Sequence, residues 1–304
     1  MRIYMRFAVF IFFITSQAFA GKFFDRRSKI LFKEERYSFN ENWVKSGVNE
    51  KESIKILLGL ILKSGMGKKI IKKAQKRAQT YGQTLFDVIS IGETSLTDTT
   101  LIRKFRRSGP LKVIYETRSQ VFIDKDLNVK DAALDLAHEL THFALRSAFN
   151  PYSEHFGPVS FIKSTVEGTG GEIEAFLVEC AVLKDLFSSQ IYFSSNCPRV
   201  GGSKKQGVVE YYKVGAFYEK FKDKFKDFPY LSPEKPLFIS SVYGIPYPIA
   251  AFREYKSIIK KVCSNNRKQL GLIEKNKSPE FWQLKQKIES RCQNIYSLLH
   301  MPIH

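Results

Sequence analysis

After its first twenty residues the chain has no apolar run of about twenty residues, the length that a membrane-spanning helix requires. The apolar stretch Ile56–Leu62 has only the length of a buried helix. None of the four cysteines stands in C-x-x-C spacing, which argues against a cysteine zinc site. The chain also lacks internal repeats and low-complexity tracts, so a repeat architecture is excluded. These absences leave an ordinary globular protein.

The composition fits that class, because 43% of the 304 residues are hydrophobic and 26% are charged. Acidic residues are scarce relative to basic ones, and the formal net charge is +19. Partners with negative charge are therefore favoured, such as an anionic envelope polymer or a membrane surface. No nucleic-acid-binding motif accompanies the charge. The basic run Lys68–Arg77 is interpreted as a solvated helix face or as a dedicated binding patch.

The N-terminus is typical of an exported protein. Residues 1–6 are basic, Phe7–Ile14 is a short apolar core, and Ala18-Phe19-Ala20 matches a signal-peptidase site. We expect residues 1–20 to be a signal peptide that is cleaved after Ala20, with an uncleaved anchor as the alternative. The mature chain would be periplasmic or secreted, and without Arg2 and Arg6 its charge would be about +17.

The cysteines agree with an oxidising compartment, because they are even in number and widely spaced. Three pairings are possible. We expect the two short-range disulfides, Cys180–Cys197 and Cys263–Cys292. The first would tie a helix to the loop that follows it.

The pentapeptide His138–His142 reads H-E-L-T-H, which is the pattern H-E-x-x-H. On a helix, positions i and i+4 share one face, so His138 and His142 can direct two imidazoles at one metal ion. Glu139 lies one residue further around the turn, where a carboxylate can act as a general base on a water molecule. The alternative is a solvated helix that carries these residues by coincidence.

The surrounding residues predict that this motif lies inside a buried helix. Asn128 is a candidate N-cap, and apolar residues recur at helical spacing from Val129 to Ala144. The helix should end near Asn150-Pro151, because the residue before a proline avoids helical geometry. Upstream, the short run Val121–Ile123 predicts a strand.

A catalytic zinc site needs a third protein ligand. A second helix is expected to begin at about Glu172, after a glycine-rich break, and to continue at least to Leu183. Glu172 is the preferred ligand, although an acidic residue in a first helical turn also complements the helix dipole. The remaining glutamates of this segment stay open as ligands: Glu167, Glu174 and Glu179.

With these motifs the chain resembles the gluzincin branch of the zincin metallopeptidases. In that branch a glutamate from a second helix follows H-E-x-x-H, and Glu172–Ala175 is similar to the E-x-E-A motif of some members. The resemblance covers about residues 120 to 185. It implies that His138, His142 and Glu172 bind Zn²⁺, with Glu139 as general base. The family usually has Asp or Asn four residues after the ligand glutamate, where this chain has Phe176.

Glu179 could replace that missing acid as the group that orients an imidazole. Six residues after His142 stands Ala148, so the metzincin extension of the motif is absent. His155 is a candidate to bind the oxyanion of the reaction, to be a fourth ligand, or to be an ordinary loop histidine. Further oxyanion candidates are tyrosines: Tyr211, Tyr212, Tyr243 and Tyr247.

The expected fold is α+β, with a zincin-like core in which a small antiparallel or mixed sheet covers the H-E-x-x-H helix. We divide the chain into a signal peptide (1–20), a helical N-terminal region (21–109) and a zincin-like core with a helical C-terminal part (110–304). Helices are expected over 51–84 with a break near 64–67, over 101–105 and 208–225, and over 249–299 with an interruption near 276–279. A strand is expected at 112–115 and a loop over 228–248.

The sequence predicts an exported zinc metallopeptidase that acts on a protein or peptide. Two alternatives remain at this level. One is a zincin fold without catalytic activity. The other is a basic protein that binds anionic components of the cell envelope.

Overall fold

The computed structural model describes a mainly helical chain with one small sheet, which confirms the α+β class. The described residues are 38–47, 49–105, 113–153, 155–190, 196–226, 228, 230–273, 282, 283, 285, 286, 289 and 292. The predicted signal peptide lies outside them. No helix among the described residues combines the length and the apolar character needed to cross a membrane.

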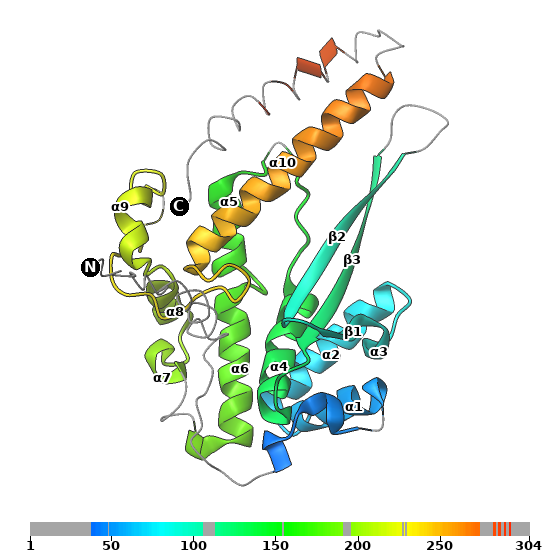
Figure 1. The fold of residues 1–304 in the computed structure, drawn as a ribbon, viewed down its shortest axis with the longest axis vertical. Coiled ribbons are helices and arrows are strands. Elements are labelled where there is room, and N and C mark those ends of the chain that lie inside the picture. Colours follow the sequence, from blue (N-terminus) through cyan, green and yellow to red (C-terminus); the bar gives the residue numbers. More distant parts are fainter. Residues whose placement is uncertain are drawn as a thin grey trace, which may run out of the picture.

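The helices and strands follow one another along the chain as shown in Figure 1. Their bounds are α1 (Glu50–Ile61), α2 (Gly65–Thr80), α3 (Leu85–Val88), β1 (Ile89–Gly92), β2 (Leu96–Phe105), β3 (Val113–Asp124), α4 (Val129–Leu145), α5 (Pro158–Val166), α6 (Glu172–Leu186), α7 (Cys197–Val200), α8 (Lys204–Tyr211), α9 (Tyr218–Phe221) and α10 (Tyr247–Ile273).

The sheet has the strand order β1-β3-β2, so β2 is an edge strand. β1 runs parallel to β3 and β2 runs antiparallel to it, with Thr97 opposite Val121. The helix expected at 101–105 is therefore wrong, because these residues belong to β2 and pair with 113–117. The strand expected at 121–123 and the described part of the one expected at 112–115, residues 113–115, belong to one long strand, β3.

α4 is the central helix of the fold and packs against the sheet, α2 and α6 (Figure 1). As expected, the Asn128 side chain caps it by accepting a hydrogen bond from the backbone N–H of Asp131. The helix ends at Leu145, five residues before the predicted end. The following residue, Arg146, has an extended backbone and turns the chain away from the helix axis.

Two helical expectations are confirmed and a third is wrong. α1 and α2 are separated at Ser64, which caps α2, and α6 begins at Glu172. The single helix expected over 208–225 is interrupted after α8, because Gly215 has a left-handed backbone and hydrogen-bonds to Glu234. No described residue from 230 to 246 belongs to a helix or strand, as predicted for this loop.

Both predicted disulfides are present. Cys180–Cys197 joins α6 to α7, and Cys263–Cys292 joins α10 to the C-terminal segment. The boundary expected at 109/110 lies outside the described residues. Side chains from α1, α2, α4 and α6 share one hydrophobic core, so the N-terminal helices pack directly on the helix that carries H-E-x-x-H.

Candidate metal centre

The two histidines of the motif lie side by side on α4. Their rings are 4.8 Å apart between centroids and nearly perpendicular. Both side chains are buried, with His138 at 1% exposure and His142 at 4%. The i, i+4 spacing thus places two imidazoles on one face of a buried helix, as the sequence predicts.

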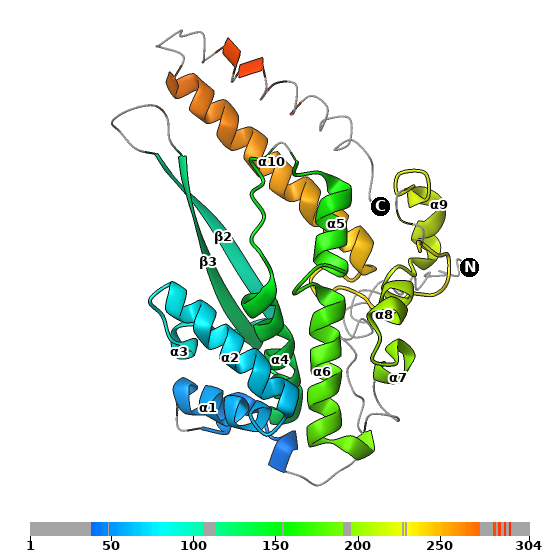
Figure 2. The same ribbon diagram turned by 180° about the vertical axis from the view of Figure 1, so that it is seen from behind.

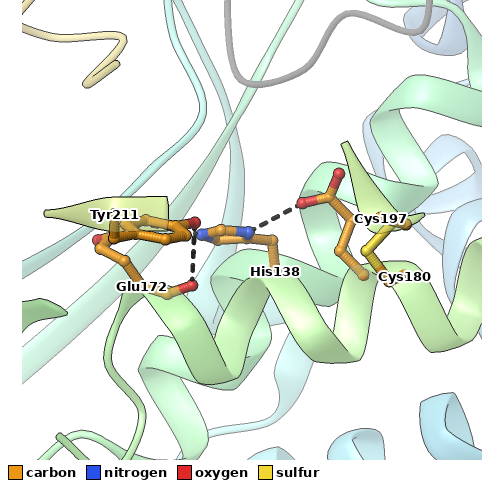
Figure 3. Close-up of a disulfide and its surroundings, with 6 residues drawn as sticks. His138, Glu172, Cys180, Cys197 and Tyr211 are labelled. Atoms are coloured by element: carbon orange, nitrogen blue, oxygen red, sulfur yellow. Dashed lines mark hydrogen bonds and ion pairs between the residues drawn. A yellow bond between two sulfur atoms is a disulfide. The ribbon is translucent and has the colours of Figure 1, made fainter. Parts of the chain in front are cut away.

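Glu172 completes the group from the first turn of α6. One carboxylate oxygen, Oε2, lies 3.4 Å from His138 Nε2, and the other, Oε1, lies 3.3 Å from His142 Nε2. One ligand atom from each residue can be chosen so that all three lie within 4.8 Å of one another. Figure 3 shows Glu172 directed toward the His138 ring. The three residues could hold one metal ion.

The other three candidate glutamates have different partners. Glu179 contacts the far nitrogen of His138, at 3.0 Å from Nδ1. Glu174 accepts a hydrogen bond from the Gly170 backbone N–H, and Glu167 accepts one from the Tyr212 hydroxyl. Among the described residues, Glu172 is therefore the glutamate that faces both imidazoles.

Each imidazole is held through its Nδ1 atom. Glu179 Oε2 lies against Nδ1 of His138, whereas His142 Nδ1 lies 2.8 Å from the Gly170 carbonyl oxygen. A carbonyl only accepts, so His142 must carry its proton on Nδ1 and present the Nε2 lone pair to Glu172. This is the arrangement by which metal-binding histidines are oriented by outer partners.

Gly170 makes the second of these contacts possible. Its φ of +66° is left-handed, and a Cβ atom there would lie 2.4 Å from the backbone nitrogen of Arg146. Only glycine allows this loop to approach the end of α4 so closely. The glycine-rich break before α6 thus positions both the Gly170 carbonyl and Glu172.

Electrostatics favour a cation between the ligands. Burial lowers the pKa of His142, and the nearby Arg146 charge adds to this effect, so the imidazole is neutral at pH 7. The Arg146 guanidinium lies 3.4 Å from Glu172 Oε1 and favours the ionised form of this carboxylate. An imidazole lone pair then faces an ionised carboxylate at 3.3 Å. A bound cation turns that repulsion into two attractive contacts, so the donor set fits a metal ion.

Glu139 lies next to this group with a fixed carboxylate. Thr97, on edge strand β2, donates from its hydroxyl to Glu139 Oε2 at 2.8 Å and is also 3.0 Å from the Glu139 carbonyl oxygen. Glu139 is completely buried. The strand therefore orients the acid that the sequence singles out as a general base.

Arg146 is a site residue that sequence analysis missed. Its guanidinium lies 3.4 Å from Glu172 Oε1 and donates to the Thr165 carbonyl, while Arg77 donates to the carbonyl of Arg146 itself. Arg146 stands four residues after His142, so it extends the i, i+4 series of the motif. This four-residue spacing was the indication in the sequence that Arg146 lies near the two histidines.

A cleft of about 310 Å³ opens onto the metal-ligand group. Its walls come from the start of β2, the end of α4, the last turn of α5, the start of α6, the loop before α10 and the first turns of α10. The lining residues are Leu96, Thr97, Asp98, Glu139, His142, Arg146, Thr165, Glu172, Ser240, Ser241, Val242, Tyr243, Tyr247, Ala250, Ala251 and Glu254.

The oxyanion candidates separate into two sets. His155 is exposed and is not among the residues that line the cleft, and the structure does not bring it to the metal-ligand group. The Tyr211 hydroxyl donates to the Glu172 backbone carbonyl (Figure 3), and that of Tyr212 donates to Glu167. Tyr243 and Tyr247 line the cleft. Burial raises the pKa of Tyr243, so its hydroxyl stays protonated at neutral pH and can donate.

A second cavity of about 280 Å³ adjoins the cleft and shares Thr97, Asp98, Arg146, Thr165 and Glu254 with it. Its remaining wall is largely apolar and includes the rings of Phe149, Phe156 and Phe161, which are in mutual contact. A bulky apolar side chain would find contacts there.

The described residues therefore contain a buried group that could bind a metal, a fixed carboxylate beside it and a cleft that reaches both. Comparisons with protein-family models, with curated proteins and with solved structures find no match for this chain.

Proposed function

We propose that this protein is an exported, zinc-dependent metallopeptidase of the gluzincin type. The observation that carries the proposal is the position of Glu172. Its two carboxylate oxygens face the Nε2 atoms of His138 and His142, and Glu139 lies beside them at the cleft.

The donor set favours Zn²⁺ over harder ions. Two neutral imidazoles and one carboxylate are typical ligands of catalytic zinc, whereas Mg²⁺ and Ca²⁺ prefer oxygen alone. When bound, Zn²⁺ supplies Lewis acidity that polarises a carbonyl and makes water a stronger acid. His138, His142 and Glu172 would hold it.

Glu139 is the proposed general base. Its carboxylate would take a proton from the attacking water and deliver it to the leaving amine. Thr97 fixes Oε2, which leaves the orientation of Oε1 defined as well. Tyr243 and Arg146 are the cleft residues that could donate hydrogen bonds to the carbonyl oxygen as it gains negative charge.

The substrate we propose is a polypeptide in extended form. β2 is an edge strand, and three of its residues, Leu96, Thr97 and Asp98, line the cleft. An extended peptide could add to this edge by backbone hydrogen bonds, which would lay its scissile bond across the ligand group.

Export is supported by two features. Disulfides persist in oxidising compartments, and the structure contains two of them. The N-terminal residues carry the pattern of a cleaved signal peptide, with Gly21 as the first mature residue.

The test starts with the zinc content of the chain from Gly21 onward, beside the variants His142→Ala and His155→Ala. We expect about one zinc per chain in the wild type. The His142 variant should lose it, and the His155 variant should retain it. A folded wild-type protein that neither contains zinc nor takes it up would end the proposal.

Catalysis is tested separately with Glu139→Gln. This variant should bind zinc as the wild type does, while hydrolysis of a peptide library falls by roughly 10²- to 10⁴-fold. Near-normal hydrolysis in this variant would exclude Glu139 as the general base.

A further inference from the structure

The N-terminal helices α1 to α3 carry a surface that the metal centre does not explain. Five exposed lysines cover the outer side of α2: Lys68, Lys69, Lys72, Lys73 and Lys76. At 100° per residue they fall within an arc of about 140°, and they extend over about 12 Å of the helix. α2 contains no acidic residue. We call these five residues the lysine face.

The lysine face is not paired with acidic side chains of the described residues. Within the part of the chain that the structure describes, none of the five ammonium groups forms an ion pair. The buried side of α2, with Ile70, Ile71 and Ala74, packs toward α4. The face is therefore directed outward, and Figure 2 shows α2 in front of α4 in that view.

Exposed apolar side chains gather on the same three helices. In the described residues seven large hydrophobic side chains are more than about a third exposed. Four of them are Ile56, Leu62, Met66 and Phe86, with exposures between 36% and 42%. Single exposed apolar residues need no explanation, but a concentration of them beside a charged face does.

A groove connects the two features. It has a volume of about 570 Å³ between α1, α2 and α3, with an apolar floor that includes Leu58, Ile71 and Leu85. Leu62 and Phe86 line it, as do Lys55 and glutamines from α2. The groove lies along one flank of α2, so apolar surface and positive charge face the solvent together.

We propose that α1, α2 and α3 form a docking face for a lipid bilayer with anionic headgroups. The lysine face would lie over the headgroups, while Leu62 and Phe86 would enter the interfacial region beside them. This combination of lysines and exposed apolar residues is what interfacial helices use. A soluble polyanion would bind through the lysines alone and would not require Leu62 and Phe86.

The lysines also favour a bilayer over an acidic protein. An ammonium group is a compact point charge without the bidentate geometry by which arginine recognises one fixed carboxylate. Five such charges in an arc suit a laterally mobile array of headgroups. Each lysine near an anionic membrane surface increases the partitioning of a protein onto it by about fivefold. The inference is independent of the metal centre.

The test is sedimentation of the chain from Gly21 onward with phosphatidylcholine vesicles, with and without phosphatidylglycerol, at low and at high salt. This chain retains every described residue and omits the apolar N-terminal segment, which would itself bind lipid. We expect binding that requires phosphatidylglycerol and weakens with salt. Failure to bind phosphatidylglycerol vesicles at low salt would overturn the proposal.

Two pairs of variants assign the binding to this face. The first pair compares K68Q/K69Q/K72Q/K73Q with K204Q/K205Q/K260Q/K261Q, which removes equal charge from exposed positions on α8 and α10. The variant on α2 should lose on the order of a hundredfold in partitioning, and the matched variant much less. Equal losses would show a general charge effect and refute the docking face.

The second pair compares L62Q/F86Q with Y230Q, an exposed aromatic residue elsewhere in the fold. L62Q/F86Q should weaken vesicle binding and leave binding to soluble dextran sulfate unchanged. If vesicle binding is unaffected, the surface binds polyanions and the bilayer proposal is wrong. Each variant should also have the same thermal unfolding temperature as the wild type, which ensures that folded proteins are compared.

Discussion

The contact between Glu179 and His138 allows a graded prediction about metal affinity. His138 Nδ1 lies 3.0 Å from Glu179 Oε2, and the two residues are only 1% and 5% exposed. Replacement of Glu179 by Ala leaves a buried imidazole N–H without its acceptor, which costs about 1–3 kcal/mol. The tautomer that presents Nε2 to the metal is then no longer selected.

Since 1.4 kcal/mol corresponds to about tenfold in an equilibrium constant, Glu179→Ala should weaken zinc binding by roughly ten- to a hundredfold. Glu179→Gln keeps the length of the side chain and one acceptor oxygen but loses the charge. The Gln variant should therefore bind zinc at most about tenfold more weakly than the wild type, because charge-assisted hydrogen bonds are only about twice as strong as neutral ones.

The assay is competition for zinc against a chromophoric chelator at neutral pH. Asp185→Asn is the matched control, because Asp185 lies on the same helix but accepts hydrogen bonds from Ser64 and Gly65 at the start of α2. That variant should lose stability and keep zinc affinity. Wild-type affinity in Glu179→Ala, or a larger loss in the Gln variant than in the Ala variant, would refute the orienting role.

Three further predictions concern catalysis, stability and pH. Thr97→Val removes the hydroxyl that orients Glu139, so kcat should fall by roughly tenfold with zinc content unchanged; an unaltered kcat would contradict the role of that hydrogen bond. Replacement of Cys180 and Cys197 by Ser opens a disulfide with a sequence separation of 17 residues and should lower the free energy of unfolding by about 3 kcal/mol in denaturant titrations. The buried His142 has a lowered pKa in the folded state, so below its ordinary value of 6.5 the unfolded state binds more protons. The metal-depleted protein should therefore lose stability as the pH falls through about 6.5, and His142→Ala should remove that part of the pH dependence in thermal unfolding curves.

The local part of the site was predictable from the sequence because it depends on helical spacing. His138 and His142 share a helix face whatever surrounds them, and Asn128 caps the helix through a contact three residues away. Glu172 was preferred over its neighbours because H-E-x-x-H stands upstream and Glu172–Ala175 is similar to the E-x-E-A motif, and the structure directs it to both imidazoles. Short-range cysteine pairing was likewise a local inference.

The errors arose where long-range contacts decide the conformation. Residues 101–105 have apolar positions that also fit a helix, but they pair with residues 113–117 of the neighbouring strand. The helix expected over 208–225 breaks where Val214 and Gly215 bond to the segment 232–234. Such pairing leaves no periodic trace in the sequence.

The same limit explains the missed site residues. Thr97 reaches Glu139 from a strand 42 positions earlier, and no pattern around Thr97 indicates this. Arg146 could have been found from its helical spacing. Its partners Thr165 and Glu172, however, depend on how α5 and α6 return to α4.

The buried charges of the site give an independent reason to expect a divalent ion. Three acids of the site, Glu139, Glu172 and Glu179, are at most 7% exposed, and the Arg146 guanidinium lies 3.4 Å from Glu172. Buried acids that lie close together repel one another, and burial adds to the cost of their charge. A divalent cation between the two imidazoles and Glu172 opposes that repulsion more strongly than a monovalent cation does. The site is therefore closer to electrostatic balance with the metal than without it, so metal binding should also stabilise the fold.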